Sequence, residues 1–409
     1  MQCGLLGRKL GHSYSPQIHA CLSDYDYTLF ELEPDSLADF LKNGQFNGLN
    51  VTIPYKKEVI PYCDELSPAA RKLGAVNTLV RKDGRLIGHN TDYFGFLTMV
   101  KASGLNVSGK KVLVLGSGGA STTVVAVLES LNANAIVISR NGENNYTNLN
   151  LHSDASIIVN TTPVGMYPNN GDSPIKLDLF PQLEGVLDLI YNPARTKLLL
   201  DAEARKIVAM NGLLMLVAQA KESAEWFTGN KIADSIITQI YNKLRFQMTN
   251  IILVGMPGCG KTTIGKILAQ KLNRPFIDAD AEIVRASGKT IPEIFAESGE
   301  TGFRKIETQV LTELGKESGK IIATGGGCVT VPKNYPLLHQ NGNIIWIQRE
   351  LFLLATEGRP LSEKSRLVSM YEVRESLYRD FSDYFIKNDC SPETAAERIL
   401  SVYTEDTMR

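Results

Sequence analysis

The chain has 409 residues, enough for two or three domains at the usual ~100 to 200 residues each. Lys plus Arg total 43 and Asp plus Glu total 44, a balance that does not favour a nucleic-acid or membrane-surface binder. The six cysteines show neither paired zinc-type spacing nor a disulfide framework, and no apolar run approaches ~18 residues. We therefore expect a cytoplasmic protein that binds small molecules and has no nucleic-acid or membrane partner.

Residues 1 to about 100 alternate strand-like segments (CGLLG, YTLFEL, GLNVTIP) with helical ones (SPQIHACLSDY, PDSLADFLKNG). Polar side chains follow the expected strand ends: Asn50, Thr52, Lys56, Asn77, Asn90 and Asp92. Such groups can hydrogen-bond a polyhydroxylated ligand, although each is also a good turn residue. Ser13 and Ser15 precede a helix, and Ser15 ahead of Pro16 is equally suited to cap that helix.

From about residue 110, KKVLVLGSGGASTTVVAVLESLNA predicts a buried strand, a Gly-rich turn and a helix, and AIVISR predicts the next strand. Gly116 and Gly118 begin a dinucleotide fingerprint that Ser121 leaves incomplete. Arg140 stands where an NAD site more often has an acidic residue, which indicates NADP; nearby Glu143 argues against this, and an exposed strand end is the alternative. The polar segment NGENNYTNLNLHSDA predicts that the following helix is truncated or absent.

A further strand, turn and helix begins after the helical stretch ADSIITQIYNKLRFQ, which ends near Met248. The segment GMPGCGKTT satisfies the phosphate-loop pattern with Gly255, Gly260, Lys261 and Thr262. Backbone N–H groups and the helix N-terminus bind phosphate oxygens there, Lys261 neutralises their charge, and Thr262 can bind Mg²⁺. The pattern therefore predicts a nucleotide triphosphate site, in which Cys259 serves only as a small filler.

Two carboxylates, Asp278 and Asp280, end the next expected strand in FIDADAEI. Their spacing predicts that both side chains lie on one side of the strand, where one could bind the metal and the other a substrate hydroxyl. The alternative is that both are ordinary exposed surface residues. Further along, Arg304 and Glu307 lie one helical turn apart, and the glycines of IIATGGGCV would let the backbone approach a ligand closely.

Two more arginines follow. Arg359 lies in the polar stretch GRPLS, which suits a lid, and Arg374 lies in the helical segment YEVRESLY. Taken singly, such arginines are more often surface or salt-bridge residues.

Together, the phosphate loop, DAD, FRKIE, GGG, RPL and RESLY resemble shikimate kinase over about residues 250 to 405. The resemblance implies that ATP with Mg²⁺ phosphorylates shikimate. It implies that the nucleotide is bound by Gly258, Cys259, Gly260, Lys261, Thr262 and Thr263, and that Mg²⁺ is bound on the side of Thr262 and Asp278. Asp280 would accept a hydrogen bond from the shikimate hydroxyl, and Arg304, Arg374 and the Gly326 backbone would hold the shikimate carboxylate. Arg359 would close over the transferring phosphoryl group. The segment LLATEGRPLS is shorter than in many members of that family and lacks their adenine-flanking arginine.

The N-terminal motifs, with GSGGAS, VNTTPVGM, DLIYNP and MLVAQA, resemble shikimate dehydrogenase across about residues 1 to 245. The resemblance implies reduction of 3-dehydroshikimate by NADPH, with Lys56 and Asp92 as the proton-transfer pair and Lys56 as the general acid/base. It implies a substrate site of Ser13, Ser15, Thr52, Asn77, Asp92, Tyr191 and Gln219 and a cofactor site of Gly116, Ser117, Gly118, Gly119, Ala120 and Arg140. The chain departs from the family at SRN, where NRT is usual, and at Asn211-Gly212, where DG is frequent.

We therefore expect three α/β domains: a substrate-binding domain at 1–103 completed by helices at about 213–246, a Rossmann-like NADP domain at 104–247, and a P-loop kinase domain with a parallel sheet at 248–409. Two successive steps toward chorismate would then share one chain, with a homodimer left open. A regulator built from inactive copies is one alternative, which the presence of the key lysines and carboxylates disfavours. A chain with one working half, its dehydrogenase weakened by the shortened cofactor region, is the other.

Overall fold

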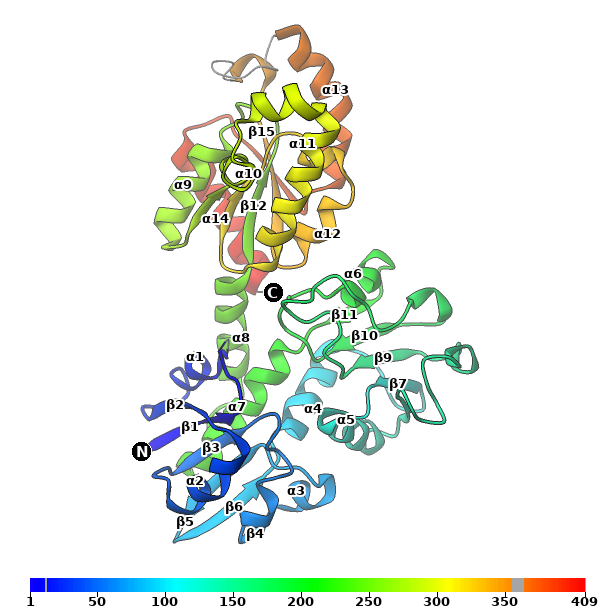
Figure 1. Cartoon of the computed structure of the whole chain (residues 1–409), viewed down its shortest axis with the longest axis vertical. Coiled ribbons are helices and arrows are strands. Elements are labelled where there is room, and N and C mark those ends of the chain that lie inside the picture. Colours follow the sequence, from blue (N-terminus) through cyan, green and yellow to red (C-terminus); the bar gives the residue numbers. More distant parts are fainter. Residues whose placement is uncertain (12, 355–363, 409) are drawn as a thin grey trace. The chain divides into compact units, whose positions relative to one another are not determined.

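The computed structural model describes residues 1–11, 13–354 and 364–408. The chain divides into two compact units, which we describe separately (Figure 1). The first comprises Met1–Val164, Asp172–Tyr191 and Leu198–Tyr241, and the second comprises Gly165–Gly171, Asn192–Lys197 and Asn242–Arg409. Helix α8 (Ser235–Met248) contains the main point of division and ends where the sequence predicts.

A six-stranded mixed sheet with the order β2-β1-β3-β5-β6-β4 opens the first unit. Its strands are β1 (Gln2–Gly7), β2 (Asp26–Glu31), β3 (Gly48–Val51), β4 (Glu65–Leu66), β5 (Thr78–Lys82) and β6 (Arg85–His89). The helical segments among them are α1 (Ser15–His19), η1 (Pro34–Ser36), α2 (Leu37–Asn43), η2 (Ile60–Tyr62) and α3 (Pro68–Leu73). Asp83 and Gly84, both with positive φ, join β5 to β6 as the Asp-Gly pair of a tight hairpin.

The second sheet of this unit is parallel throughout, with the order β11-β10-β9-β7-β8. Its strands are β7 (Lys111–Leu115), β8 (Asn134–Ile138), β9 (Ile157–Asn160), β10 (Gly185–Asp188) and β11 (Val208–Met210). The accompanying helices are α4 (Asp92–Ser103), α5 (Gly119–Ser130), η3 (Leu149–His152), η4 (Leu177–Leu179), α6 (Lys197–Ala204) and α7 (Leu213–Thr228). Only the single turn η3 lies between β8 and β9, which confirms the predicted shortening. Strand order reverses between β7 and β9, and ligands bind at such switch points.

The second unit contains another fully parallel sheet, with the order β13-β14-β12-β15-β16. Its strands are β12 (Asn250–Val254), β13 (Phe276–Asp278), β14 (Ile321–Ala323), β15 (Gly342–Gln348) and β16 (Tyr384–Lys387). The helices are α9 (Lys261–Leu272), α10 (Ala279–Ser287), α11 (Ile291–Lys316), η5 (Cys328–Thr330), α12 (Asn334–His339), η6 (Leu351–Leu353), α13 (Lys364–Asp380) and α14 (Pro392–Met408). Figure 1 shows α9 and α14 on one side of this sheet and α11 and α12 on the other.

These layers confirm the predicted α/β fold class. The apolar residues of β12 are fully buried, as expected for a central parallel strand covered on both faces. The phosphate loop follows this strand directly, so it lies where parallel sheets bind their ligands. Within the described ranges, no helix is long and apolar enough to cross a membrane.

Candidate active sites

Lys56 and Asp92 form a close ion pair in the first unit. Lys56 Nζ lies 2.7 Å from Asp92 Oδ2, and the two side chains are 25% and 13% exposed. Thr52 stays at the end of β3 because its N–H donates to Leu6 O, and the turn after it brings Lys56 toward Asp92, the first residue of α4. A partly shielded ammonium held by a carboxylate can deliver a proton to a substrate oxygen.

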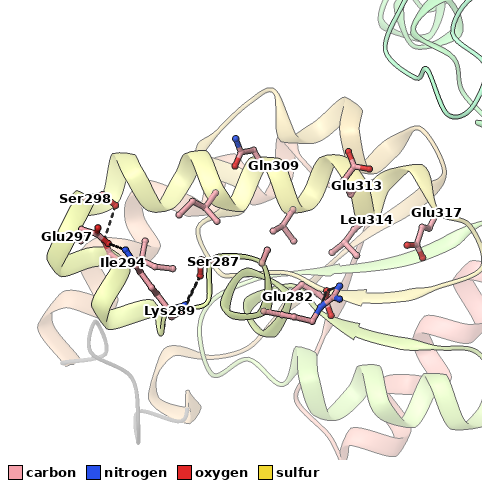
Figure 2. Close-up of a pocket in the computed structure, with 14 residues that line it drawn as sticks. Glu282, Ser287, Lys289, Ile294, Glu297, Ser298, Gln309, Glu313, Leu314 and Glu317 are labelled. Carbon is pink, nitrogen blue, oxygen red and sulfur yellow. Dashed lines mark hydrogen bonds and ion pairs between the residues drawn. The ribbon is translucent and has the colours of Figure 1, made fainter.

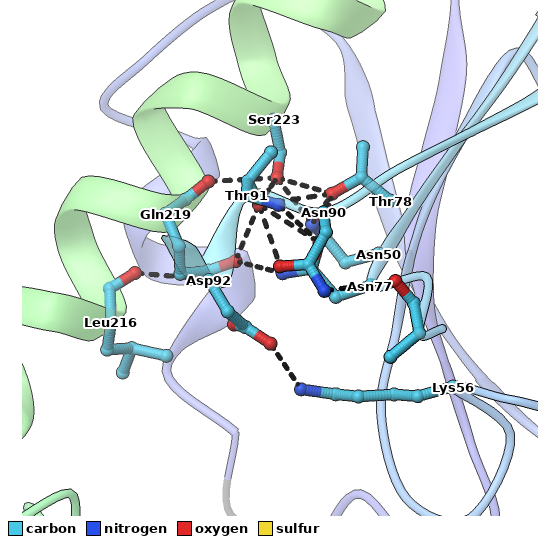
Figure 3. Close-up of polar contacts among 11 residues, drawn as sticks. Asn50, Lys56, Asn77, Thr78, Asn90, Thr91, Asp92, Leu216, Gln219 and Ser223 are labelled. Atoms are coloured by element: carbon cyan, nitrogen blue, oxygen red, sulfur yellow. Dashed lines mark hydrogen bonds and ion pairs between the residues drawn. The ribbon is translucent and has the colours of Figure 1, made fainter. Parts of the chain in front are cut away.

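A buried polar network fixes the side-chain amide of Asn77 beside this pair (Figure 3). Asn77 Oδ1 accepts from Thr91 N at 2.7 Å, and Asn77 Nδ2 donates to Thr91 Oγ1 at 3.0 Å and to Gln219 Oε1 at 3.4 Å. Ser223 Oγ on α7 lies 3.0 Å from Thr91 Oγ1 and accepts from Asn50 Nδ2 at 2.7 Å. Asn50 is therefore a member of this buried network as well, and its reading as a ligand-binding amide stays a prediction.

The predicted carboxylate-binding serines lie at the start of α1. Ser15 N donates to Ser13 Oγ at 3.2 Å. The capping alternative for Ser15 is wrong: the N-cap is Tyr14, which has no side-chain cap, and Ser15 is the first helical residue and is buried. Tyr191 packs edge-on against Tyr14 with ring centroids 6.0 Å apart, and burial raises the pKa of Tyr191. Tyr191 is therefore a close neighbour of the serine turn.

The Gly-rich turn joins β7 to α5 at the switch point of the parallel sheet. Gly116 has a φ of +103°, and a Cβ atom added there would lie 2.9 Å from Thr161 Oγ1, so only glycine suits this crossing. Gly118 caps α5 and Gly119 begins it, and a Cβ at either would meet nothing within 4 Å. Open space over a helix N-terminus fits a dinucleotide diphosphate.

Arg140 is exposed two residues beyond β8. The polar segment after it is held as a compact loop: Asn148 Nδ2 donates to Glu143 O at 2.8 Å, and Asn145 N donates to Asn148 Oδ1 at 2.8 Å. Burial raises the pKa of Tyr146 in this loop, and the charge of Arg140 opposes that rise. Amide side chains thus stabilise the loop that replaces the missing helix.

The phosphate loop of the second unit depends on glycine at three positions. Gly255, Gly258 and Gly260 have φ values of +144°, +82° and +103°. Lys261 begins α9 and is buried, and its Nζ donates to Gly255 O at 2.8 Å and to Met256 O at 3.1 Å. The ammonium is therefore held directly over the loop, as phosphate binding requires.

The metal side combines a hydroxyl and a carboxylate. Thr262 Oγ1 donates to Asp278 Oδ2 at 3.1 Å, and Asp278 Oδ1 accepts from Asp280 N at 3.1 Å. The prediction that both carboxylates share one strand is wrong: Asp278 caps α10, so the strand ends there and Asp280 lies in the first helical turn. The described chain has no group of three or more metal-ligating side chains, and Mg²⁺ typically needs only one or two carboxylates beside substrate phosphates.

Asp280 and Arg304 face the Gly-rich loop that follows β14. A Cβ added at Gly325 would lie 2.8 Å from Asp280 Oδ1, and one at Gly327 would overlap the Arg304 guanidinium. Arg304 Nη1 donates to Glu307 Oε2 at 2.8 Å, and both residues lie in α11, as their predicted separation of one helical turn requires. Burial raises the pKa of Glu307, and the Arg304 charge opposes that rise.

Arg374 completes this site from α13, because its Nη1 donates to Gly326 O at 3.2 Å. The structure thus gathers Asp280, Arg304, Gly326 and Arg374 around one loop. Arg359 lies outside the described residues.

Two residues that sequence reasoning left unassigned also contact these loops. Asn388, which follows β16, donates from Nδ2 to Cys259 O at 2.8 Å, and Tyr378 donates to Gly326 O at 2.5 Å. Tyr378 belongs to the RESLY motif and lies one helical turn after Arg374, so its spacing was a usable signal. Nothing in the sequence around Asn388 indicates its contact.

A pocket of about 570 Å³ between α10 and α11 is lined by none of the predicted site residues (Figure 2). Its apolar wall includes Ile294 and Leu314, and the rim includes the ion pair of Lys289 with Glu297. We assign no ligand to this pocket.

Comparison with known proteins agrees with both parts of the chain. The family model of the shikimate dehydrogenase substrate binding domain matches residues 5–79, and that of shikimate kinase matches residues 257–404. The shikimate dehydrogenase (NADP(+)) of Clostridium perfringens is 36% identical over 264 residues, which are 59% of this chain and 97% of that protein.

Two solved structures extend the comparison. A chorismate mutase/shikimate 5-dehydrogenase fusion protein from Clostridium acetobutylicum is 38% identical with a TM-score of 0.57, over 59% of this chain and 96% of that chain. Shikimate 5-dehydrogenase from Thermus thermophilus in complex with NADP(H) and shikimate is 31% identical with a TM-score of 0.54, over 58% of this chain and 97% of that chain. Both resemblances stated from the sequence are therefore confirmed. The chain belongs to the shikimate dehydrogenase family in its N-terminal part and carries a shikimate kinase domain in its C-terminal part, so it combines two enzymes of the shikimate pathway.

Proposed function

We propose that the first unit reduces 3-dehydroshikimate to shikimate with NADPH, and that the kinase domain transfers the γ-phosphoryl group of ATP to the 3-hydroxyl so formed. The observation that supports this proposal is that the chain brings together two separate groups of polar and charged side chains, each suited to a small hydroxylated acid. One contains the Lys56–Asp92 ion pair, and the other places Asp280 and Arg304 at a Gly-rich loop in the unit that holds the phosphate loop.

In the dehydrogenase site, NADPH bound at the 116–120 turn supplies the hydride for the carbonyl carbon. Lys56 donates a proton to the oxygen as the hydroxyl forms, and Asp92 holds the ammonium in position through the 2.7 Å ion pair. Because the Lys56 side chain is 25% exposed, water can return the proton. Asn77 and Gln219 hold the ring hydroxyls, and the hydroxyls of Ser13 and Ser15 hold the carboxylate, with Thr52, Asp92 and Tyr191 completing the wall.

The choice of NADP rests on Arg140, whose exposed guanidinium suits the 2′-phosphate of the adenosine ribose. The NADP(+) in the name of the Clostridium perfringens relative and the NADP(H) bound to the Thermus thermophilus enzyme support this assignment. The open space at Gly118 and Gly119 fits the diphosphate.

In the kinase site, ATP bound at the phosphate loop supplies the phosphoryl group, and Mg²⁺ would be held by Thr262 and Asp278. Asp280 accepts a hydrogen bond from the 3-hydroxyl and orients its oxygen for attack. Arg304 and Arg374 hold the shikimate carboxylate, because a planar guanidinium offers it two parallel donors. Lys261 neutralises the phosphate oxygens from its place over the loop, and the role of Arg359 in closing over the phosphoryl group stays a prediction.

We also propose that the domain limits lie near residues 103 and 247, in accord with helix α8 at the main division. No disulfide joins the cysteines of the described residues, and Cys3, Cys259 and Cys328 are buried, which suits the reducing cytoplasm.

A coupled assay tests the function. The purified chain receives 3-dehydroshikimate, NADPH, ATP and Mg²⁺, and NADPH oxidation and ADP release are followed separately. We expect ADP release to follow NADPH oxidation after a lag, to stop when NADPH is omitted, and to resume when shikimate is added. NADPH oxidation without ADP release would leave only the dehydrogenase working, and ADP release without NADPH or shikimate would refute the assigned acceptor.

A further inference from the structure

Tyr378 connects three parts of the kinase domain through one side chain. It is fully buried on α13, and its ring stacks on Trp346 of β15 with centroids 5.7 Å apart. Its hydroxyl donates to Gly326 O at 2.5 Å and lies 3.8 Å from Met256 Sδ in the phosphate loop. Tyr378 thus contacts the central sheet, the nucleotide loop and the Gly-rich loop at once.

The Gly326 peptide is held from two sides. Its carbonyl accepts from the Tyr378 hydroxyl and from Arg374 Nη1 at 3.2 Å. A Cβ at Gly326 would lie 2.8 Å from Pro257 Cδ, so the backbone packs directly on the phosphate loop. In a trans peptide the C=O and the following N–H point in opposite directions, so a carbonyl fixed toward α13 directs the Gly327 N–H away from it.

The backbone N–H groups of residues 325–327 are suited to an anion. In the part of the chain that the structure describes, none of these three N–H groups donates to another group of the chain. Successive backbone N–H groups bind carboxylates and phosphates when their direction is fixed. Of the three, the Gly327 N–H shares its peptide plane with the Gly326 carbonyl, so its direction depends on the groups that hold that carbonyl.

We propose that Tyr378 is a positioning residue for shikimate: its hydroxyl fixes the Gly326 carbonyl so that the Gly327 N–H and the guanidinium of Arg374 face the shikimate carboxylate. The inference rests on the proposed kinase reaction and deepens it. Arg374 contacts the same carbonyl through Nη1, so its position depends on that carbonyl, and a guanidinium has further N–H groups to offer the substrate. Burial raises the pKa of Tyr378 far above its ordinary value, so the hydroxyl remains a donor at any pH used for an assay.

The test is Tyr378→Phe, which removes only the hydroxyl. We expect KM for shikimate in the kinase reaction to rise about tenfold, equivalent to ~1.4 kcal/mol. KM for ATP and kcat at saturating shikimate should stay within about threefold, because Lys261, Thr262 and Asp280 are untouched. The dehydrogenase activity of the same sample serves as an internal standard for the amount of chain whose first unit is folded.

The matched control is Tyr403→Phe. Tyr403 is also fully buried in the second unit, and its hydroxyl lies within hydrogen-bond distance of Phe246 O and Thr249 O, away from the Gly-rich loop. Its removal should lower the stability of the kinase domain without changing KM for shikimate. The proposal is overturned if KM for shikimate is unchanged in Tyr378→Phe, or if KM for shikimate and KM for ATP rise equally. It is also overturned if Tyr378→Phe loses kinase activity altogether, or if Tyr378→Phe and Tyr403→Phe show the same change in KM for shikimate. Failure of the proposed function is a separate outcome, since the parent chain would then not phosphorylate shikimate at all.

Discussion

Replacing Lys56 by Ala should stop the dehydrogenase and spare the kinase. The substitution removes the ammonium that lies 2.7 Å from Asp92 Oδ2. A positioned general acid contributes roughly 10²- to 10⁴-fold to a rate, so we expect kcat for shikimate oxidation to fall by about that factor. This corresponds to about 3 to 5 kcal/mol of transition-state stabilisation.

The same change should leave the fold intact. Asp92 is buried and loses its ion-pair partner, so we expect a cost in stability of about 1 to 3 kcal/mol, between that of an exposed pair and that of a fully buried one. Asp92 remains at the first position of α4, where the positive end of the helix dipole favours a carboxylate. A loss of this size is below a typical unfolding free energy of about 5 to 15 kcal/mol, so lost activity would report chemistry and not unfolding.

Both reactions are measured on one preparation: NADPH formation with shikimate and NADP, and ADP release with shikimate and ATP. Lys57→Ala is the matched control, because Lys57 is the exposed neighbour of Lys56 in sequence. We expect Lys57→Ala to retain both activities. If Lys56→Ala kept its dehydrogenase rate, the acid/base role would be refuted, and if it lost both activities together, the independence of the two sites would be refuted.

Lys261→Ala should show the reverse, with ATP-dependent phosphorylation lost by at least about 10²-fold and shikimate oxidation retained; equal loss of both activities would contradict it. Arg140→Ala should raise KM for NADP with little effect on NAD, and equal changes for both cofactors would reject its phosphate role. Burial lowers the pKa of His89 to about 4, so below about pH 6.5 the unfolded chain binds a proton that the folded chain excludes, and stability falls with falling pH. His89→Phe replaces the imidazole by a ring that can still stack on Trp226 but cannot bind a proton. Between about pH 7.5 and about pH 5, the free energy of unfolding measured in urea should fall by about 2 kcal/mol less in this variant than in the parent chain. An equal fall in both proteins would refute the assignment to His89.

The sites that the sequence predicted well are those whose geometry is local. Lys261 and Thr262 stand in one strand–turn–helix segment, so residue spacing determines where each side chain lies. Arg304 and Glu307 likewise share one helix, and their 2.8 Å contact follows from i, i+3 spacing. The Asp278–Asp280 prediction failed because it assumed that the strand continued, whereas a capping aspartate ends the strand and starts a helix.

The contacts that the sequence could not indicate join distant segments. Asn50 and Ser223 lie 173 residues apart in the chain, and Tyr378 and Gly326 lie 52 residues apart. Asn50 lies within β3 and Asn77 directly precedes β5, yet only the fold shows that Asn50 faces Ser223. Helical spacing offers a partial signal, because Ser223 follows Gln219 by one turn and Tyr378 follows Arg374 by one turn.

The two proposed sites would hold the same carboxylate with different chemistry, and the charges of the two proposed reactions give a reason. In the proposed dehydrogenase site, neutral hydroxyls of Ser13 and Ser15 would face the carboxylate, whereas a fixed cation there would repel the Lys56 ammonium on which proton delivery would depend. In the proposed kinase site, the substrate would approach a triphosphate, so the guanidinium groups of Arg304 and Arg374 would offset repulsion between two anions while binding the carboxylate. Affinity for shikimate in the kinase reaction should therefore weaken with rising salt more steeply than in the dehydrogenase reaction.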